Sequence, residues 1–133
     1  MGIRVKKMPN FGKYTKRIKN SNSNLYSITE SVIVGIIKRT QSGKDKNSKG
    51  FKPYSKSYGK TGRVNLTDKG SMLQSITRKK IKDGVRLYFG SSNENSKAYG
   101  NQVTYKRKFF GIDKKQMKHI KERLGNFIVK TTK

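Results

Sequence analysis

The sequence predicts a small α+β domain in which helices flank a short antiparallel sheet. Three stretches carry apolar residues at helical spacing, at about 26–41, 68–76 and 113–129. Another stretch, at about 77–90, alternates apolar and polar residues after a glycine-containing turn, which is typical of a β-hairpin. Apolar residues make up only 31% of the 133 residues, so we expect a small core.

The N-terminal segment differs in character from the rest of the chain. Residues 1–24 contain several lysines and arginines, no acidic residue, and alternating asparagine and serine at 20–24. Pro9 and Gly12 would interrupt a helix in this segment. We therefore expect a basic, extended or disordered arm, followed by a single folded domain over residues 25–133.

The first helix is expected over about 26–41. Four apolar residues recur there at helical spacing, namely Leu25, Ile28, Val32 and Ile36. Ser27 followed by Glu30 fits a capping box, and Gly43 is a typical stop residue. The β-branched run at 32–34 leaves a strand as the alternative, but the length and the caps favour a helix.

A long basic loop and a short helix are expected next. Residues 42–65 show no periodicity and are rich in lysine, glycine and aromatic residues, and a loop of this length is usually functional or disordered. Thr67 is a good cap, and Asp68 suits the positive end of a helix dipole. We therefore expect a short helix at about 68–76.

The hairpin at 77–90 allows two turn registers. A two-residue turn would place lysines on the core face of the sheet. A three-residue turn at 82–84 instead pairs Ile81 with Val85 and gives Gly84 a left-handed conformation, so this register is the prediction. After a loop, a third strand is expected at about 102–109.

The last expected element is a helix at about 113–129. Asp113 is its cap, and Gln116 occupies the third position of a capping box. Phe109 and Phe110 precede this helix, and two adjacent phenylalanines must point in different directions. Either both are buried by the helix, or one is exposed at a subunit interface.

No residue pattern predicts catalysis or a cofactor. The seven acidic residues are scattered singly, and the one histidine, His119, lies among basic residues, which favours a surface position. The chain has no cysteine, no phosphate-binding loop and no nucleophile elbow. We expect a non-enzyme with no catalytic or metal-binding residue, no cofactor and no small-molecule substrate.

Positive charge is the dominant feature of the sequence. Lys and Arg total 33 against 7 acidic residues, which gives a formal net charge of +26. Such a chain requires an anionic partner: nucleic acid first, an acidic protein second, a membrane surface third. The apolar runs are too short to span a bilayer, and the N-terminus has no apolar signal region, so we expect no membrane location.

Three basic clusters are candidates for contact with DNA or an acidic partner. The first is interleaved with aromatic side chains that could stack on single-stranded bases. The candidate residues are Lys44, Lys46, Lys49, Lys52, Lys56, Arg78, Lys79, Lys80, Lys106 and Arg107. The alternative is that these cations form an ordinary solvated surface. No motif for sequence-specific nucleic-acid recognition is present.

Three stretches, taken in order, indicate a family. Arg-Thr-Gln-Ser-Gly-Lys-Asp at 39–45 leads through Gly-Phe-Lys-Pro-Tyr-Ser at 50–55 to Tyr58. Leu-Thr-Asp-Lys-Gly-Ser-Met-Leu-Gln-Ser-Ile follows at 66–76, and Arg-Lys-Phe-Phe-Gly-Ile at 107–112. Over about residues 25–128 their order and spacing resemble the tail-completion, or virion-morphogenesis, proteins of tailed bacteriophages, which act at the head–tail joint.

The resemblance implies an α+β subunit of a closed homo-oligomeric ring, of six copies, at the neck of a virion. It also implies synthesis in the host cytoplasm, other neck and tail proteins as partners, and double-stranded DNA in the channel. No catalytic residue carries over from the family. Candidate subunit-interface residues are Phe51, Pro53, Tyr54, Tyr58, Phe109 and Phe110. The alternatives are a tail-terminator ring protein and a non-specific nucleic-acid-binding protein of the ribosomal or nucleoid type.

Overall fold

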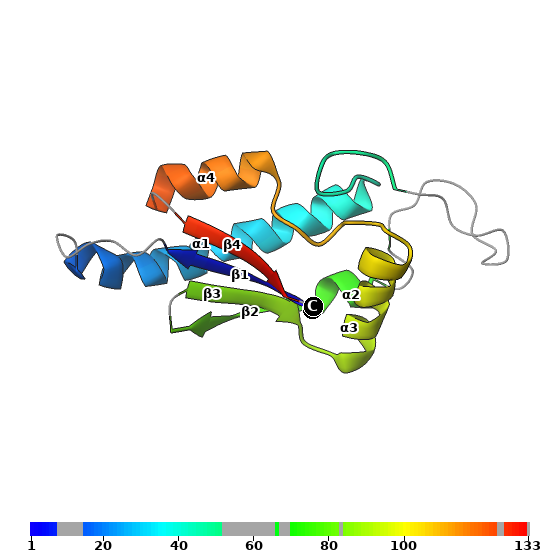
Figure 1. Ribbon diagram of the computed structural model, residues 1–133, viewed down its shortest axis with the longest axis horizontal. Coiled ribbons are helices and arrows are strands. Elements are labelled where there is room, and N and C mark those ends of the chain that lie inside the picture. Colours follow the sequence, from blue (N-terminus) through cyan, green and yellow to red (C-terminus); the bar gives the residue numbers. More distant parts are fainter. Residues whose placement is uncertain (8–14, 52–65, 67–69, 83, 125–126, 133) are drawn as a thin grey trace, which may run out of the picture.

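The computed structural model describes residues 1–7, 15–51, 66, 70–82, 84–124 and 127–132 (Figure 1). The fold is α+β, as predicted: a four-stranded antiparallel sheet of order β2-β3-β1-β4 has α1 along one face. The elements are β1 (Gly2–Lys7), α1 (Thr15–Gln41), α2 (Ser71–Gln74), β2 (Ile76–Ile81), β3 (Gly84–Phe89), α3 (Ser92–Tyr99), the π-helix η2 (Gly100–Thr104), α4 (Lys114–Leu124) and β4 (Phe127–Thr132).

The prediction of an N-terminal arm is wrong, because the first residues form a central strand. β1 pairs with β3 on one side and with β4 on the other. Ile3 and Val5 are fully buried in the core, while Arg4 lies between them on the other face of the sheet. The sheet therefore joins the two ends of the chain, and the core extends beyond the predicted domain of residues 25–133.

Helix α1 confirms the predicted helix and rules out the strand alternative, but it begins earlier than expected, at Thr15. Ser27 and Glu30 therefore lie inside the helix and do not cap its start. Its expected apolar stripe faces the core, since Leu25, Ile28, Val32 and Ile36 are all buried. The helix ends at Gln41, and Gly43 has a positive φ of 84°, which confirms the glycine stop.

The hairpin is confirmed as β2 and β3, but the predicted register is wrong by one residue. Ile81 pairs with Gly84, and Lys80 pairs with Val85. Gly84 has no positive φ; a Cβ there would lie 2.0 Å from the carbonyl oxygen of Val5. Glycine is thus needed because β1 approaches closely and not because of a left-handed turn.

The observed register puts two cations on the helix-facing side of β2, and an aromatic ring on α1 accommodates them. The guanidinium carbon of Arg78 lies 4.1 Å from the ring centroid of Tyr26, and the Lys80 ammonium lies 5.2 Å from it. Arg78 also forms an ion pair with Glu30, at 3.5 Å. β2 is an edge strand, and Lys80 is exposed there while Arg78 is partly buried.

The segment after the hairpin is helical. Residues expected to form a loop at 90–101 instead form α3 and the start of η2, and the expected strand at 102–109 is absent. Val103, expected on a strand face, is exposed on η2. The side-chain amide of Gln102 bonds both the N–H and the carbonyl of Phe110, so a side chain satisfies backbone groups that a strand partner would otherwise satisfy.

The C-terminal helix is shorter than predicted. Its capping box is confirmed, since Asp113 Oδ1 accepts from the Gln116 N–H at 2.7 Å and Gln116 Oε1 accepts from the Asp113 N–H at 3.0 Å. α4 ends at Leu124, and the residues expected to complete it instead form β4. The short helix predicted at about 68–76 is α2, which covers only Ser71–Gln74. The proposed caps at 67 and 68 lie outside the described residues.

Two adjacent phenylalanines form the centre of the core. Phe109 and Phe110 are 0% and 1% exposed, and their ring centroids lie 6.2 and 4.8 Å from that of Phe89. Both are therefore buried by their own chain, and the prediction that they form a subunit interface is wrong.

Candidate functional site

The face of the sheet turned away from α1, which we call the open face, carries a transverse row of basic positions, one on each strand. Lys79 on β2 is paired with Arg86 on β3, Arg86 with Arg4 on β1, and Arg4 with Lys130 on β4. Side chains alternate along a strand, so these four positions lie on the face opposite the one that packs against α1. We call Lys79, Arg86, Arg4 and Lys130 the basic row.

The four strands contain no acidic residue to balance this row. Like charges directly opposite one another on neighbouring strands destabilise a sheet. Within the described part of the chain, the Nε atoms of Arg4 and Arg86 are buried and have no hydrogen-bond partner. Backbone pairing between the strands therefore keeps these four positions side by side although their like charges repel.

One aromatic ring supports the row. Tyr88 lies two residues after Arg86 on the same face, and the Lys79 ammonium and the Arg86 guanidinium lie 5.4 and 5.8 Å from its ring centroid. Cation–π contacts at these distances are weak but favourable. They direct both cations to one place on the sheet without neutralising them.

Arg39, whose Nε is also buried without a partner, differs from Arg4 and Arg86 in having acceptors for its other nitrogens. Arg39 of α1 donates from Nη1 to Asp113 at 3.0 Å and to Gln116 at 3.1 Å, and from Nη2 to the carbonyls of Phe109 and Gly111 at 2.8 and 2.9 Å. Its side chain is only 8% exposed. This arginine fastens α1 to the segment that leads into α4, which is a structural role.

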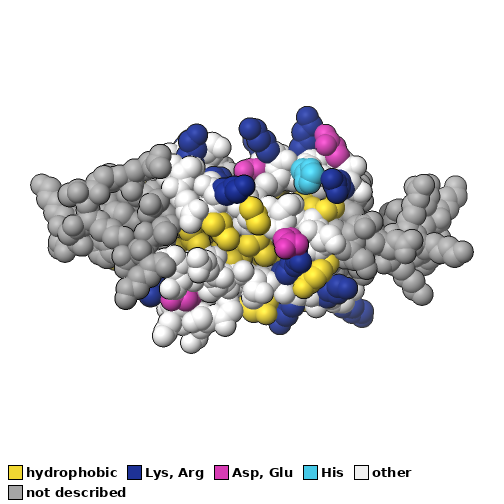
Figure 2. All heavy atoms as spheres, turned by 180° about the vertical axis from the view of Figure 1, so that it is seen from behind, with side chains coloured by type: hydrophobic (Ala, Val, Ile, Leu, Met, Phe, Trp, Pro, Cys, Tyr) yellow, Lys and Arg dark blue, Asp and Glu magenta, His cyan; other side chains and the backbone are white. Residues whose placement is uncertain are grey.

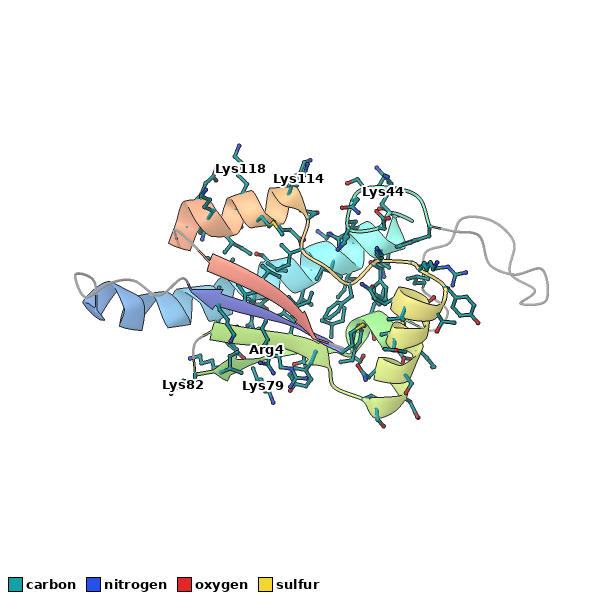
Figure 3. All side chains as sticks on the ribbon, viewed as in Figure 1. Arg4, Lys44, Lys79, Lys82, Lys114 and Lys118 are labelled. Atoms are coloured by element: carbon teal, nitrogen blue, oxygen red, sulfur yellow. The ribbon has the colours of Figure 1, made fainter. Side chains whose placement is uncertain are left out.

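The basic residues singled out from the sequence do not form one site. Lys44 and Lys49 are exposed in the turn after α1, and Lys46 is half-buried, with its N–H on the carbonyl of Lys108. Figure 3 shows Lys44 on the side of the molecule away from Arg4 and Lys79. Lys52 and Lys56 lie outside the described residues.

Of the remaining candidates, only Lys79 belongs to the basic row. Arg78 and Lys80 point to the helix side, and Lys106 is exposed after η2. Arg107 is buried and donates to the side chain of Asn101 at 2.9 Å, so its prediction as a surface contact is wrong.

Three residues of the row were missed from the sequence. Arg4 falls in the expected arm, Arg86 is a polar position of the expected hairpin, and Lys130 follows the expected last helix. The alternation of Ile3 and Val5 with Arg4 is a period-two signal that could have identified the strand. The partners of this strand could not be predicted in the same way, because they depend on pairing between the two ends of the chain.

Among the described residues, large exposed apolar side chains occur in two places. Val34 on α1 and Met117 on α4 are 45% and 40% exposed. Figure 2, which views the molecule from the side of α1, shows hydrophobic side chains gathered near the centre of that face. We call Val34 and Met117 the helix patch.

The second set of exposed apolar residues surrounds η2. Tyr99, Val103 and Tyr105 are 43%, 40% and 54% exposed. We call these three residues the η2 patch. In Figure 1, α4 lies at the upper left and α3 at the lower right. The predicted interface residue Phe51 is half-buried against the core, and Pro53, Tyr54 and Tyr58 lie outside the described residues.

His119 is exposed on α4. No three His, Asp or Glu side chains in the described parts of the chain lie close enough to hold a metal ion. Among the same residues, none of the helices combines the length and apolar character needed to cross a bilayer. Comparison of the chain with protein-family models, with curated proteins and with solved structures found no match.

Proposed function

We propose that this chain is a structural virion protein of a tailed phage, which associates with copies of itself in a ring at the head–tail junction. The observation that carries the proposal is the pair of dissimilar apolar patches on one subunit. When two different surfaces of the subunit bind each other head to tail, a growing assembly presents one unused surface of each kind at its two ends. Association therefore continues until a ring closes.

The family resemblance supports this choice among oligomeric proteins. Its three stretches meet around one junction: Arg39 bonds the 107–112 stretch, and Asn101 links the 66–76 stretch by contacting Met72 and Arg107. Described residues from each of the three stretches therefore lie close together in one part of the molecule. The two apolar patches are exposed, where contacts between subunits would form.

Complementing variants test the ring directly. Val34→Glu places a charge in the helix patch, and Tyr105→Glu places one in the η2 patch. The parent chain should form a ring in about 0.5 M NaCl, which screens repulsion between the basic subunits. Each variant alone should remain monomeric by light scattering, and Asn47→Glu, at an exposed position outside both patches, should behave like the parent.

An equimolar mixture of the two variants distinguishes the geometry. Each variant retains the patch that the other lacks, so the mixture should form a dimer that cannot grow. A mixture that stays monomeric, or single variants that still assemble fully, would contradict a head-to-tail ring.

The assignment to a virion is tested separately, by the genes beside this one. Genes for portal, adaptor and tail-tube proteins are expected there, and their order would distinguish a tail-completion ring from a tail-terminator ring. A neighbourhood of ribosomal or metabolic genes would contradict the assignment.

A further inference from the structure

We infer that the open face of the sheet is a binding surface for the phosphate backbone of duplex nucleic acid, with the basic row as its centre. This surface lies apart from both apolar patches. The inference therefore does not rest on the proposed ring, and the two are tested separately.

The first step is that the row lacks internal compensation where other cations of the protein have it. Arg78 stacks on Tyr26 and pairs with Glu30, and Arg39 has four acceptors. Arg4 and Arg86 lie directly opposite each other on neighbouring strands, and the four strands carry no acidic residue that could pair with them. An anion on this face would remove the repulsion by neutralising the charges of the row.

The second step is that the shape of the row suits a phosphate chain. Neighbouring strands lie about 4.8 Å apart, so four positions span about 14 Å. One strand of B-form duplex carries a phosphate about every 3.4 Å along its axis and winds round that axis, so a row of this length covers a few consecutive phosphates at most. Arginine binds phosphate through two parallel N–H groups, so Arg4 and Arg86 are the expected anchors.

The third step is that duplex suits this face better than single strands. Single-stranded binding surfaces use aromatic rings on which successive bases stack. The facing positions of β1, β2 and β3 include only one aromatic ring, Tyr88, and its partners are already Lys79 and Arg86. Those positions also carry no Asn, Gln, Asp or Glu to read base edges, so we expect little sequence preference.

The test is a fluorescence anisotropy titration of a labelled duplex oligonucleotide with the full chain, at several NaCl concentrations. The double variant R4Q/R86Q should reduce the slope of log affinity against log salt by about 1.8, at about 0.9 per lost phosphate contact. At about 0.1 M NaCl this corresponds to a loss of affinity on the order of fifty-fold.

A charge-matched control separates a site from general attraction. K114Q/K118Q also removes two positive charges, and Figure 3 shows both lysines on α4, on the opposite side of the molecule from Arg4 and Lys79. This variant should bind the duplex within about threefold of the parent, since the expected phosphate contacts remain. Equal losses in the two double variants would overturn the inference, because net charge alone would then explain binding.

Three further measurements keep the outcome decisive. R4K/R86K retains both charges, so it should keep the salt slope while losing affinity through the missing two-pronged contacts. The V34E monomer should bind duplex with the parent slope, so failure of the ring leaves this result intact. Tighter binding of polyglutamate than of duplex, lost in R4Q/R86Q, would identify an acidic protein as the partner and overturn the inference.

Discussion

Arg86 provides a test of whether the basic row is held under electrostatic strain. Its register places it directly opposite Lys79 on one side and Arg4 on the other. Arg86→Gln removes the charge and keeps a side chain of moderate length on the strand. In the absence of any anionic ligand, we expect this substitution to make the protein more stable at low salt.

The magnitude follows from the two pairs that are removed. Cross-strand charge pairs are worth about 0.2–1 kcal/mol each, so relief of two repulsions should contribute about 0.4–2 kcal/mol. Coulomb's law gives a similar value, about 0.7 kcal/mol per pair for unit charges about 6 Å apart in water. The weak Tyr88 contact that is also lost offsets about 0.5 kcal/mol, so at about 4 °C per kcal/mol Tm should rise by up to about 6 °C.

The assay is thermal and urea denaturation of parent and variant at about 0.02 M and about 1 M NaCl. At about 1 M salt the Debye length is about 3 Å, so the difference should largely disappear. A variant less stable than the parent at low salt, or a stability difference that ignores salt, would refute the reasoning.

Arg78 is the matched control on the other face of the same hairpin. Arg78→Gln removes a contact to the Tyr26 ring and an exposed ion pair to Glu30. We expect it to lower the free energy of unfolding by about 0.5–1.5 kcal/mol. If the two arginine-to-glutamine substitutions change the free energy of unfolding in opposite directions, positive charge is destabilising on one face of the sheet and stabilising on the other.

Three other substitutions test the interior by urea denaturation. Arg39→Ala breaks a buried ion pair and should lower the free energy of unfolding by about 3–5 kcal/mol, whereas a loss under 1 kcal/mol would contradict its fastening role. Gly84→Ala should disrupt the pairing of β1 with β3, because the new Cβ would meet the backbone of Val5. Gly50→Ala is the control and should be nearly neutral, because a Cβ there meets open space. Equal losses of stability in the two variants would refute the close approach of β1 to Gly84. Phe110→Ala should cost about 3–5 kcal/mol, and a small effect would show that this ring is not the core contact described above.

Local sequence patterns predicted the elements whose determinants lie close together in the chain. The Asp113–Gln116 capping box, the glycine stop at Gly43 and the hairpin each depend on a few neighbouring residues. The class, α+β, followed from these elements. The long-range features did not follow, because a six-residue strand is identified as central only when both of its distant neighbours are known.

The hairpin register shows why a sound local rule failed. Charge on a core face is normally unfavourable, so the three-residue turn was the better prediction from the hairpin alone. The decisive residues lie on α1, about 50 positions earlier, where Tyr26 and Glu30 provide a place for Arg78 and Lys80. The contacts that Arg78 and Lys80 make with this distant helix therefore outweighed the cost of placing charge on the helix-facing side of the sheet.

The same comparison bears on what the basic row is for. A solvated lysine-rich surface spreads its cations so that they avoid one another, and neutralising one of them leaves stability nearly unchanged. The basic row instead aligns cations in register, so stability and anion affinity should be opposed at the same residues. Replacing Arg86 should raise Tm and weaken duplex binding together, whereas an inert surface would change neither and a structural arginine would lower Tm. That paired result identifies a surface whose partner supplies the missing negative charge.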